Sequence, residues 1–191
     1  EGAGAPTPCP AGTFHNVTGA TSASQCEVSP SGFYSPAGSH SPVPSPPGHY
    51  VDSEGAGAPT PCPVGTFRNG PGATSIEQCE LAPIGYYSEA AATLFPCPAG
   101  TFLNETGATS VDQCQITPAG YFSLSGASSP TICPPGMWQS QSGADSCLES
   151  DIGYFSSQPG SKAQTACLEG TYQSLPGQKY CSHAARGNYS R

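Results

Sequence analysis

The hydrophobic positions of this chain recur in one short pattern, in which a glycine is followed two residues later by an aromatic side chain. The pattern opens at Gly12, Gly32, Gly48, Gly65, Gly85, Gly100, Gly120, Gly136, Gly153, Gly170 and Gly187. It places Phe14, Tyr34, Tyr50, Phe67, Tyr87, Phe102, Phe122, Trp138, Phe155, Tyr172 and Tyr189. Because successive glycines are 15 to 20 residues apart, the pattern predicts a tandem array of half-repeats of about 17 or 18 residues each.

Each half-repeat is predicted to hold two turns around one short extended segment. Pro and Gly before the aromatic favour a tight turn, because Gly adopts a backbone angle that other residues avoid. A second group of small residues after the aromatic predicts a second turn, as at Gly19, Gly72, Gly107, Gly126 and Gly143. Pro or Gly interrupts nearly every window of eight residues, which disfavours helix. A unit this small is expected to bury little more than its own aromatic, so it needs neighbours and covalent links.

Cysteines close only some of the half-repeats. The motif C-P-x-G-T-F…G-A-T-S…Q-C spans 9–26, 62–79 and 97–114, and degenerate copies span 133–147 and 167–181. Cysteine-free half-repeats separate these copies, with two in succession between Glu27 and Pro61. We expect a truncated repeat 1 at 1–44, an extra cysteine-free half-repeat at 45–61, and repeats 2 to 5 at 62–96, 97–132, 133–166 and 167–191, the last also truncated.

The two ends of the sequence resemble parts of half-repeats. The string EGAGAPTPCP occurs at Glu1–Pro10 and again at Glu54–Pro63, where it forms the tail of a half-repeat. The run Gly187-Asn188-Tyr189-Ser190 has the form of an opening. Since solenoids generally carry capping repeats, we expect these residues to come from a longer array.

Composition excludes a domain with one large core. Hydrophobic residues make up 36%, charged residues 9%, and Gly and Pro number 24 and 22. The ten cysteines form no C-x-x-C pair, which favours a disulfide framework in an oxidising compartment over zinc. The predicted fold class is therefore small disulfide-rich repeats, mostly turns and short antiparallel β-ribbons stacked into an elongated rod, with little or no helix.

Disulfide connectivity has two candidate patterns. Bonds across the cysteine-free half-repeats would require very unequal distances in sequence between paired cysteines, because two such half-repeats follow each other between Glu27 and Pro61. Bonds within the G-T-F half-repeats give loops of only 14 or 17 residues, each worth about 3 kcal/mol on the chain-entropy estimate. The spacing favours the second pattern, although the first stays open. The pairs of the second pattern are Cys9–Cys26, Cys62–Cys79, Cys97–Cys114, Cys133–Cys147 and Cys167–Cys181.

Charge and hydropathy limit the partners. The net charge is −8, and the five basic residues are scattered, so nucleic acid is not an expected partner. No apolar run approaches the roughly 20 residues that span a bilayer. We expect an extracellular or cell-surface location, with copies of the same chain as partners and other extracellular proteins as an alternative.

Covalent sugars are the predicted modifications. Asn16-Val-Thr18, Asn104-Glu-Thr106 and Asn188-Tyr-Ser190 are N-glycosylation sequons, and Asn16 and Asn104 occupy the same place in their repeats. Asn69 occupies that place too, but Gly-Pro follows it. The run Ser41–Pro47 is a candidate polyproline-II connector, and Pro42, Pro44, Pro46 and Pro47 are candidate sites for hydroxyproline-linked sugars.

The sequence does not favour an enzyme, a metal site or another cofactor. The four histidines lack metal-ligand spacing: His15, His40, His49 and His183. No serine lies in a nucleophile-elbow motif. Pairs of acids such as Glu149 and Asp151 are close in sequence, but paired-carboxylate chemistry needs a rigid cleft that tiny repeats do not offer.

The run C-P-A-G-T-F…G-A-T-S…Q-C followed by P-A-G-Y-F-S…G-A-S-S-P…C-P resembles the ephrin-receptor-like cysteine-rich repeat. Members often carry C-x-x-C after the first half and G-Y-Y-C in the second. Here the corresponding places hold Ser29, Ala82 or Thr117, and Ser35, Ser88 or Ser123. The resemblance therefore implies one missing disulfide per repeat.

Two functions follow as expectations. Low charge, Ser-Pro-rich segments and monotonous repeats are similar to algal and protist surface proteins, including flagellar hair (mastigoneme) glycoproteins, and imply a structural, filament-forming role. The alternative is a receptor-type ectodomain or adhesion module that binds a protein ligand. Its candidate hot spot is Trp138 with Met137 beside it.

Overall fold

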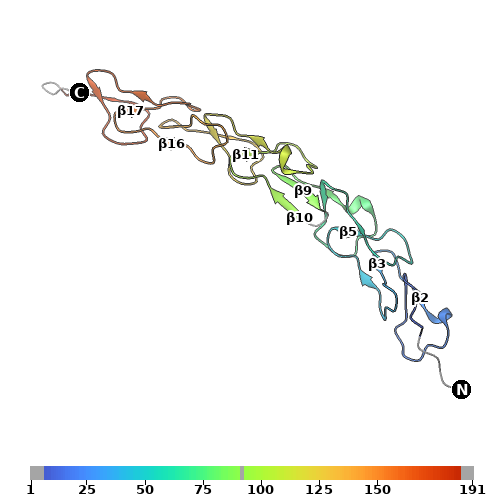
Figure 1. The fold of residues 1–191 in the computed structure, drawn as a ribbon. Helices are drawn as coiled ribbons and strands as arrows, with labels where there is room; N and C mark the ends of the chain where they lie inside the picture. Colours follow the sequence, from blue (N-terminus) through green and yellow to red (C-terminus); the bar gives the residue numbers. More distant parts are fainter. Residues whose placement is uncertain (1–6, 91–92, 186–191) are drawn as a thin grey trace. The chain divides into compact units, whose positions relative to one another are not determined.

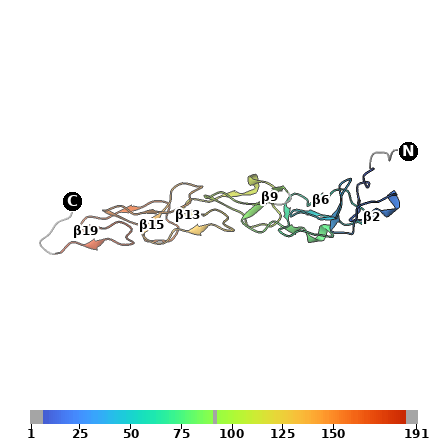
Figure 2. The ribbon, with the colours of Figure 1, turned by 90° about the horizontal axis from the view of Figure 1, so that it is seen from below.

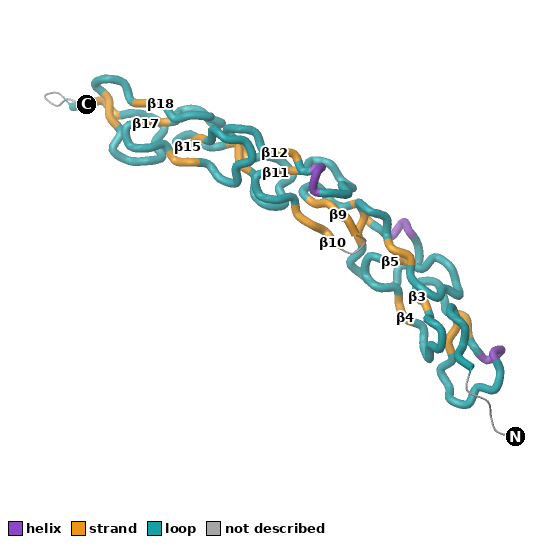
Figure 3. Tube along the Cα trace, in the orientation of Figure 1, coloured by secondary structure: helices purple, strands orange, loops and turns teal. Residues whose placement is uncertain are grey.

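A computed structural model describes residues 7–90 and 93–185 (Figure 1). The contacts divide the chain into two compact units. Unit 1 consists of Glu1–Ala82, Ser88–Leu94 and Gly107–Thr109. Unit 2 consists of Pro83–Tyr87, Phe95–Thr106 and Ser110–Arg191. Both units are built from the same element, a hairpin of two very short strands (Figure 3).

The hairpins follow each other in sequence order (Figure 2). The described residues form ten of them, and each is a separate two-stranded sheet. The strand pairs are β1 (Thr13–Phe14) with β2 (Glu27–Val28), β3 (Phe33–Tyr34) with β4 (Val43–Pro44), β5 (His49–Tyr50) with β6 (Thr60–Pro61), β7 (Thr66–Phe67) with β8 (Glu80–Leu81), β9 (Tyr86–Ala90) with β10 (Thr93–Pro96), β11 (Thr101–Phe102) with β12 (Gln115–Ile116), β13 (Tyr121–Phe122) with β14 (Thr131–Ile132), β15 (Met137–Trp138) with β16 (Leu148–Glu149), β17 (Tyr154–Phe155) with β18 (Thr165–Ala166), and β19 (Thr171–Tyr172) with β20 (Ser182–His183). The predicted class of short antiparallel ribbons is confirmed.

Each hairpin coincides with one half-repeat, and we number the half-repeats accordingly. Half-repeats 1 to 10 cover residues 9–28, 29–44, 45–61, 62–81, 82–96, 97–116, 117–132, 133–149, 150–166 and 167–183. A further hydrogen bond closes each hairpin where the next half-repeat begins. In half-repeat 6, for example, the N–H of Thr117 donates to the carbonyl of Gly100 at 3.0 Å.

The turn before the first strand explains the G-T-F signature. In half-repeat 6 the N–H of Thr101 donates to the carbonyl of Pro98 at 3.0 Å, and Gly100 between them has φ of 83°. That positive φ at the third residue of the turn requires glycine. The Thr101 hydroxyl donates to the same Pro98 carbonyl at 2.6 Å. The threonines of half-repeats 1, 4 and 10 make the same bond: Thr13, Thr66 and Thr171.

The G-A-T-S…Q-C signature forms a single turn of 3₁₀-helix before the second cysteine. These turns are η1 (Ala23–Gln25), η2 (Ile76–Gln78) and η3 (Val111–Gln113). In η1 the side chain of Ser22 accepts from the N–H of Ser24, and the Gln25 side chain accepts from Thr21 and Ser22. The serine and glutamine of the motif therefore cap the turn at its N-terminus.

The core differs from the one predicted. Nine ladder aromatics in the described residues are half-buried and Tyr172 is exposed, whereas Tyr189 lies outside the described part of the chain. The buried positions lie at the start of half-repeats 1 to 9, where the side chains are small, and three residues after the first glycine of most half-repeats, where they are mixed in size. The first group is Cys9, Ser29, Ser45, Cys62, Ala82, Cys97, Thr117, Cys133 and Ser150. The second includes Ser35, Val51, Ser88, Leu103, Ser123, Gln139 and Ser156.

Backbone hydrogen bonds join each half-repeat to the next. Between half-repeats 6 and 7, the N–H of Gly100 donates to the carbonyl of Ser123 at 2.8 Å, and that of Leu103 donates to Ala127 at 3.0 Å. In the opposite direction, the N–H of Gly126 donates to the carbonyl of Cys97 at 2.9 Å. All three bonds recur in both units, so the backbone itself specifies the stacking.

A second set of contacts joins half-repeats that are two apart. A Cβ at Gly100 would overlap the carbonyl of Gly143, the glycine of the second turn two half-repeats further on. The same close approach relates Gly12 to Gly55 and Gly65 to Gly107 in unit 1. In unit 2 it relates Gly85 to Gly126, Gly120 to Gly160, and Gly136 to Gly177. In these pairs the first glycine of one half-repeat therefore packs against the second-turn glycine of another.

The extra cysteine-free half-repeat shifts the disulfides within unit 1. Because the glycine contacts skip one half-repeat, half-repeats 1 and 3 belong to one set, and half-repeats 2 and 4 belong to the other. Cys9–Cys26 lies in the first set and Cys62–Cys79 in the second. Without half-repeat 3, both disulfides would belong to the same set.

The glycine contact can be tested with a matched pair of variants. Gly100 and Gly153 both have φ of 83°, but a Cβ at Gly153 would meet no atom of the described residues within 4 Å. We expect Gly153→Ala to cost about 1–2 kcal/mol through the left-handed backbone alone. Gly100→Ala is expected to cost several kcal/mol more, because its methyl group must displace the backbone of Gly143.

Hydrogen exchange resolved by half-repeat is the appropriate measurement, with urea unfolding beside it. Faster exchange in half-repeats 6 to 8 is expected for Gly100→Ala only. Equal effects of the two substitutions would contradict the proposed role of the contact.

Candidate binding surfaces and modification sites

All ten cysteines are paired within their half-repeats. The bonds are Cys9–Cys26, Cys62–Cys79, Cys97–Cys114, Cys133–Cys147 and Cys167–Cys181. Their Cα atoms are 5.8 or 5.9 Å apart, which is ordinary disulfide spacing. Each bond joins the first residue of a half-repeat to the residue before its closing strand. This is the arrangement that the sequence spacing favours.

Hydroxyl pairs occupy the places at which the resemblance drawn from the sequence implies a missing disulfide. In half-repeat 2 the Ser29 hydroxyl donates to Ser35 Oγ at 2.7 Å, and both residues are fully buried. Thr117 with Ser123 repeats the contact at 2.7 Å, and Ser150 with Ser156 repeats it at 2.8 Å. The residues that replace the two cysteines thus still meet, and they satisfy each other in a buried position where an unpaired hydroxyl would be costly.

Proline often stands where the second cysteine of a half-repeat would lie. Pro42, Pro59 and Pro130 immediately precede the closing strands of half-repeats 2, 3 and 7. In half-repeat 9 this place holds Gln164, which accepts from the N–H of Asp151 and donates to its carboxylate, both at 2.6 Å. Proline restricts the unfolded chain, as a disulfide does, because it fixes φ.

The described sequons lie on exposed positions. Asn16 and Asn104 are exposed. Each lies two residues after the phenylalanine that ends the first strand of its hairpin, Phe14 in β1 and Phe102 in β11. Asn69, which has no sequon, is exposed at the same place. Asn188 lies outside the described residues. Glycosylation of the three asparagines stays a prediction.

The proline-rich run Ser41–Pro47 joins half-repeat 2 to half-repeat 3. Val43–Pro44 is strand β4, and Pro46 begins the turn of half-repeat 3, in which the N–H of His49 donates to Pro46 at 3.1 Å. The run therefore crosses from one hairpin into the next. Hydroxylation of its four prolines stays a prediction. Pro44 and Pro47 are exposed, and Pro42 and Pro46 are half-buried.

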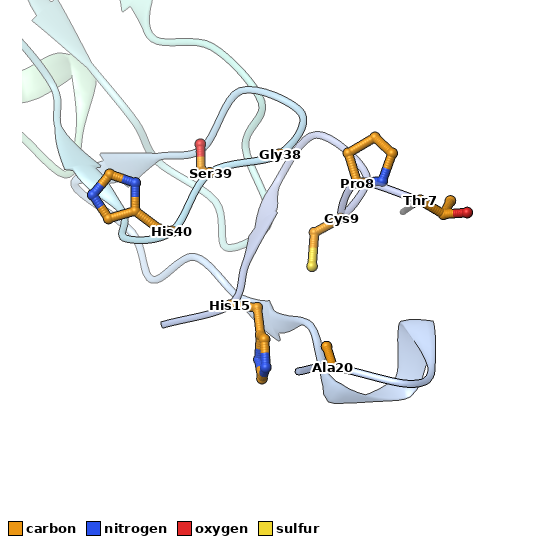
Figure 4. A pocket seen from close by; sticks show the side chains of 8 residues that line it. All are labelled: Thr7, Pro8, Cys9, His15, Ala20, Gly38, Ser39 and His40. Atoms are coloured by element: carbon orange, nitrogen blue, oxygen red, sulfur yellow. The ribbon is translucent and has the colours of Figure 1, made fainter. Parts of the chain in front are cut away.

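A hollow of about 280 Å³ in unit 1 contains two histidines (Figure 4). The imidazoles of His15 and His40 point in different directions (Figure 4). His15 Nδ1 lies 3.0 Å from the carbonyl oxygen of Gln25, to which it must donate. Among the described residues no group of three or more His, Cys, Asp or Glu side chains is placed to hold a metal ion.

Trp138 occupies the ladder position of half-repeat 8. It lies in β15 opposite Leu148, is half-buried, and its indole Nε1 is buried without a hydrogen-bond partner. Met137 beside it is half-buried at the position of the threonine in G-T-F. The two residues are thus part of the hairpin framework.

The fold and its covalent links define the class of protein, an array of small disulfide-rich β-hairpin repeats. Residues 32–79 match the family described as tyrosine-protein kinase ephrin type A/B receptor-like. This match and the five disulfides identify a cysteine-rich, ephrin-receptor-like repeat in the chain. No curated protein matches the chain.

The repeat type and the disulfides indicate an extracellular or secreted protein built from a module of non-catalytic type. Within the described ranges, no helix has the length and hydrophobicity needed to cross a bilayer.

Restoring the absent cysteines tests the buried hydroxyl pair. We expect the double variant Ser150→Cys/Ser156→Cys to form a sixth disulfide, because Ser150 Oγ and Ser156 Oγ are already 2.8 Å apart. Closing this short loop is expected to add about 2 kcal/mol of stability. Peptide mapping without reduction and thermal unfolding are the measurements. Each single cysteine variant provides the free-thiol control. A double variant whose two thiols stay free would contradict the claim that the buried hydroxyl pair lies where a disulfide can form.

Glycopeptide mass spectrometry of the chain secreted from a eukaryotic host tests the sugar sites. We expect glycans on Asn16 and Asn104, which are exposed sequon asparagines. Asn69, exposed at the equivalent position without a sequon, is the internal control and is expected to be unmodified. Unmodified Asn16 and Asn104 in the secreted protein would overturn the assignment.

Proposed function

We propose that the chain is a segment of a structural extracellular glycoprotein whose tandem repeats assemble into a filament or surface fibre. The nature of the contacts between half-repeats supports this function. They use backbone N–H and C=O groups and glycines, which recur with the period. An interface of this kind joins any half-repeat to the next and continues without closing, as a fibre requires.

Exposed apolar side chains that recur at one place in the hairpin support lateral association of arrays. The last residue of the closing strand is Val28 in half-repeat 1, Leu81 in half-repeat 4 and Ile116 in half-repeat 6. These side chains are 57%, 61% and 67% exposed. Recurrent exposed apolar residues mark interaction surfaces when they gather on one face. Because this place is apolar and exposed in several half-repeats, it favours a partner with the same spacing, which is a second copy of the array.

N-glycans would supply the hydrophilic surface that the few charged residues do not. Asn16 and Asn104 are exposed next to strands β1 and β11. The filament is therefore proposed to be a glycoprotein, similar in kind to the surface fibres of algae and protists such as flagellar hairs.

The receptor-type alternative receives less support. A ligand-binding hot spot is expected to be a non-repeating aromatic anchor. Trp138 is the candidate, but it occupies the same strand position as the aromatics of the other half-repeats and is half-buried there.

Electron microscopy of the glycosylated, oxidised protein over a range of concentrations tests the filament. We expect fibres with a repeat along the axis, and we expect mild reduction of the disulfides to abolish them. A glycosylated, fully oxidised protein seen only as isolated monomers at every concentration would contradict the proposal.

A further inference from the structure

In two half-repeats, the aromatic residue of the first strand is followed two positions later by a sequon asparagine. Phe14 precedes Asn16, and Phe102 precedes Asn104. Both rings are half-buried, and both asparagines are exposed. Leu103, which separates Phe102 from Asn104, is only 2% exposed. Because alternate residues of an extended segment point to the same side, Phe102 and Asn104 share the side that faces away from buried Leu103.

The closing strand gives separate evidence that the Asn104 side chain lies beside the Phe102 ring. Phe102 and Gln115 are opposite each other in the register of β11 and β12, and residues so paired carry their side chains on one face. Gln115 Nε2 donates to Asn104 Oδ1 at 3.4 Å. The Asn104 side chain therefore reaches the residue that is paired with Phe102. The contact uses Oδ1 and not Nδ2, the atom to which an N-glycan is attached.

The exposed apolar residue of the same closing strand lies on the other face of the hairpin. Ile116 follows Gln115 directly and is opposite Thr101 in the register, so its side chain points away from that of Gln115. In half-repeat 1 the corresponding pair is Val28 with Thr13. Each of these hairpins thus has a face with an aromatic ring and a sequon asparagine, and an opposite face with an exposed apolar side chain.

We propose that the Phe102 ring is the stacking surface for the first N-acetylglucosamine of an N-glycan on Asn104, and that Phe14 does the same for Asn16. The C–H groups on one face of the sugar ring lie against the aromatic face, whose negative charge attracts their weakly positive hydrogens. The ligand is a carbohydrate attached to the same chain. It covers the part of each aromatic side chain that the repeat array leaves exposed.

This inference rests on the proposed function, since it names what the sugars of the glycoprotein contact. It also makes a separate claim, because arrays can associate whether or not the sugars stack on the rings. The sidedness of the hairpin makes the two compatible: the sugars lie on one face, and the side chains of Val28 and Ile116 stay available on the other.

Half-repeat 4 has the ring and the asparagine without the sequon. Phe67 is half-buried, and Asn69 is exposed two residues later. Phe67 is opposite Glu80 in the register, as Phe14 is opposite Glu27 in half-repeat 1. Proline at position 71 is what breaks the sequon, so Pro71→Thr supplies a site at which the proposed contact can be introduced.

Nuclear magnetic resonance of the full 191-residue chain observes the stacking directly. The chain is secreted from a eukaryotic host with ¹³C-labelled sugar, and an endoglycosidase trims each glycan to its first N-acetylglucosamine. We expect nuclear Overhauser contacts between the sugar C–H protons and the Phe14 and Phe102 rings, with upfield shifts of those protons. Phe102→Leu is expected to abolish the shift of the sugar on Asn104, whereas Phe102→Tyr retains it.

Hydrogen exchange in half-repeat 6 measures the energetic coupling of sugar and ring. Relative to Asn104→Gln, which carries no sugar at this place, the trimmed sugar is expected to slow exchange roughly three- to tenfold. In the Phe102→Leu background we expect no slowing, and the structural cost of that substitution cancels in the cycle of variants. Phe122→Leu is the matched control, because Leu124 stands where the asparagine would lie in half-repeat 7. It is expected to leave the sugar effect unchanged.

The variant Pro71→Thr tests whether the arrangement can be transferred. We expect a glycan on Asn69 and contacts between its first sugar and the Phe67 ring. Pro71→Ala, which creates no sequon, is the control for the loss of the proline. An unmodified Asn69 in Pro71→Thr, or a sugar there that makes no contact with Phe67, would count against the ring as the surface that receives the sugar.

The outcomes separate this inference from the filament function. A sugar on Asn104 without contacts to Phe102, a sugar effect that survives Phe102→Leu, or a secreted chain without sugar on Asn16 and Asn104 would overturn the inference. If fibres form although the ring contacts are absent, the filament function stands and the inference fails. If the ring contacts are present but electron microscopy shows no fibres, the stacking stands and the filament function fails.

Discussion

The fold depends on the close approach of two glycine backbones. In both units the first glycine of most described half-repeats faces the carbonyl of a second-turn glycine two half-repeats away, as Gly100 faces Gly143, at a distance that leaves no room for a Cβ. This contact, with the three backbone hydrogen bonds between neighbouring half-repeats, replaces the side-chain core of an ordinary domain. It explains why glycine is so abundant in the chain: one glycine permits the turn and also permits the neighbour to approach.

Because stacking is done by the backbone, the side chains that fix each hairpin can vary. A disulfide closes half-repeats 1, 4, 6, 8 and 10. Half-repeats 2, 7 and 9 instead bury a pair of hydroxyl groups within the hairpin. Proline or a glutamine–aspartate contact takes the place of the second cysteine in several of these. These devices either restrict the unfolded chain or satisfy buried polar groups, so one backbone fold accepts all of them.

The surface that results exposes apolar side chains at the closing strands of half-repeats 1, 4 and 6, which are Val28, Leu81 and Ile116. The proposed lateral association would use these side chains. The chain offers no metal cluster within its described residues, and the histidines around the hollow in unit 1 point in different directions (Figure 4).

The sequence by itself located the described hairpins and their turns and favoured the observed disulfide pattern, because glycine, proline and cysteine act through local backbone angles and short loops. The prediction that the aromatics form the buried core was wrong. The array leaves Phe102 half-buried and buries Ser123 and Leu103 instead. Only the tertiary structure decided this, since burial depends on which positions face the neighbouring half-repeats. The pairing of Ser29 with Ser35 and of Gly100 with Gly143 likewise depends on distances across the stack, which no local pattern contains.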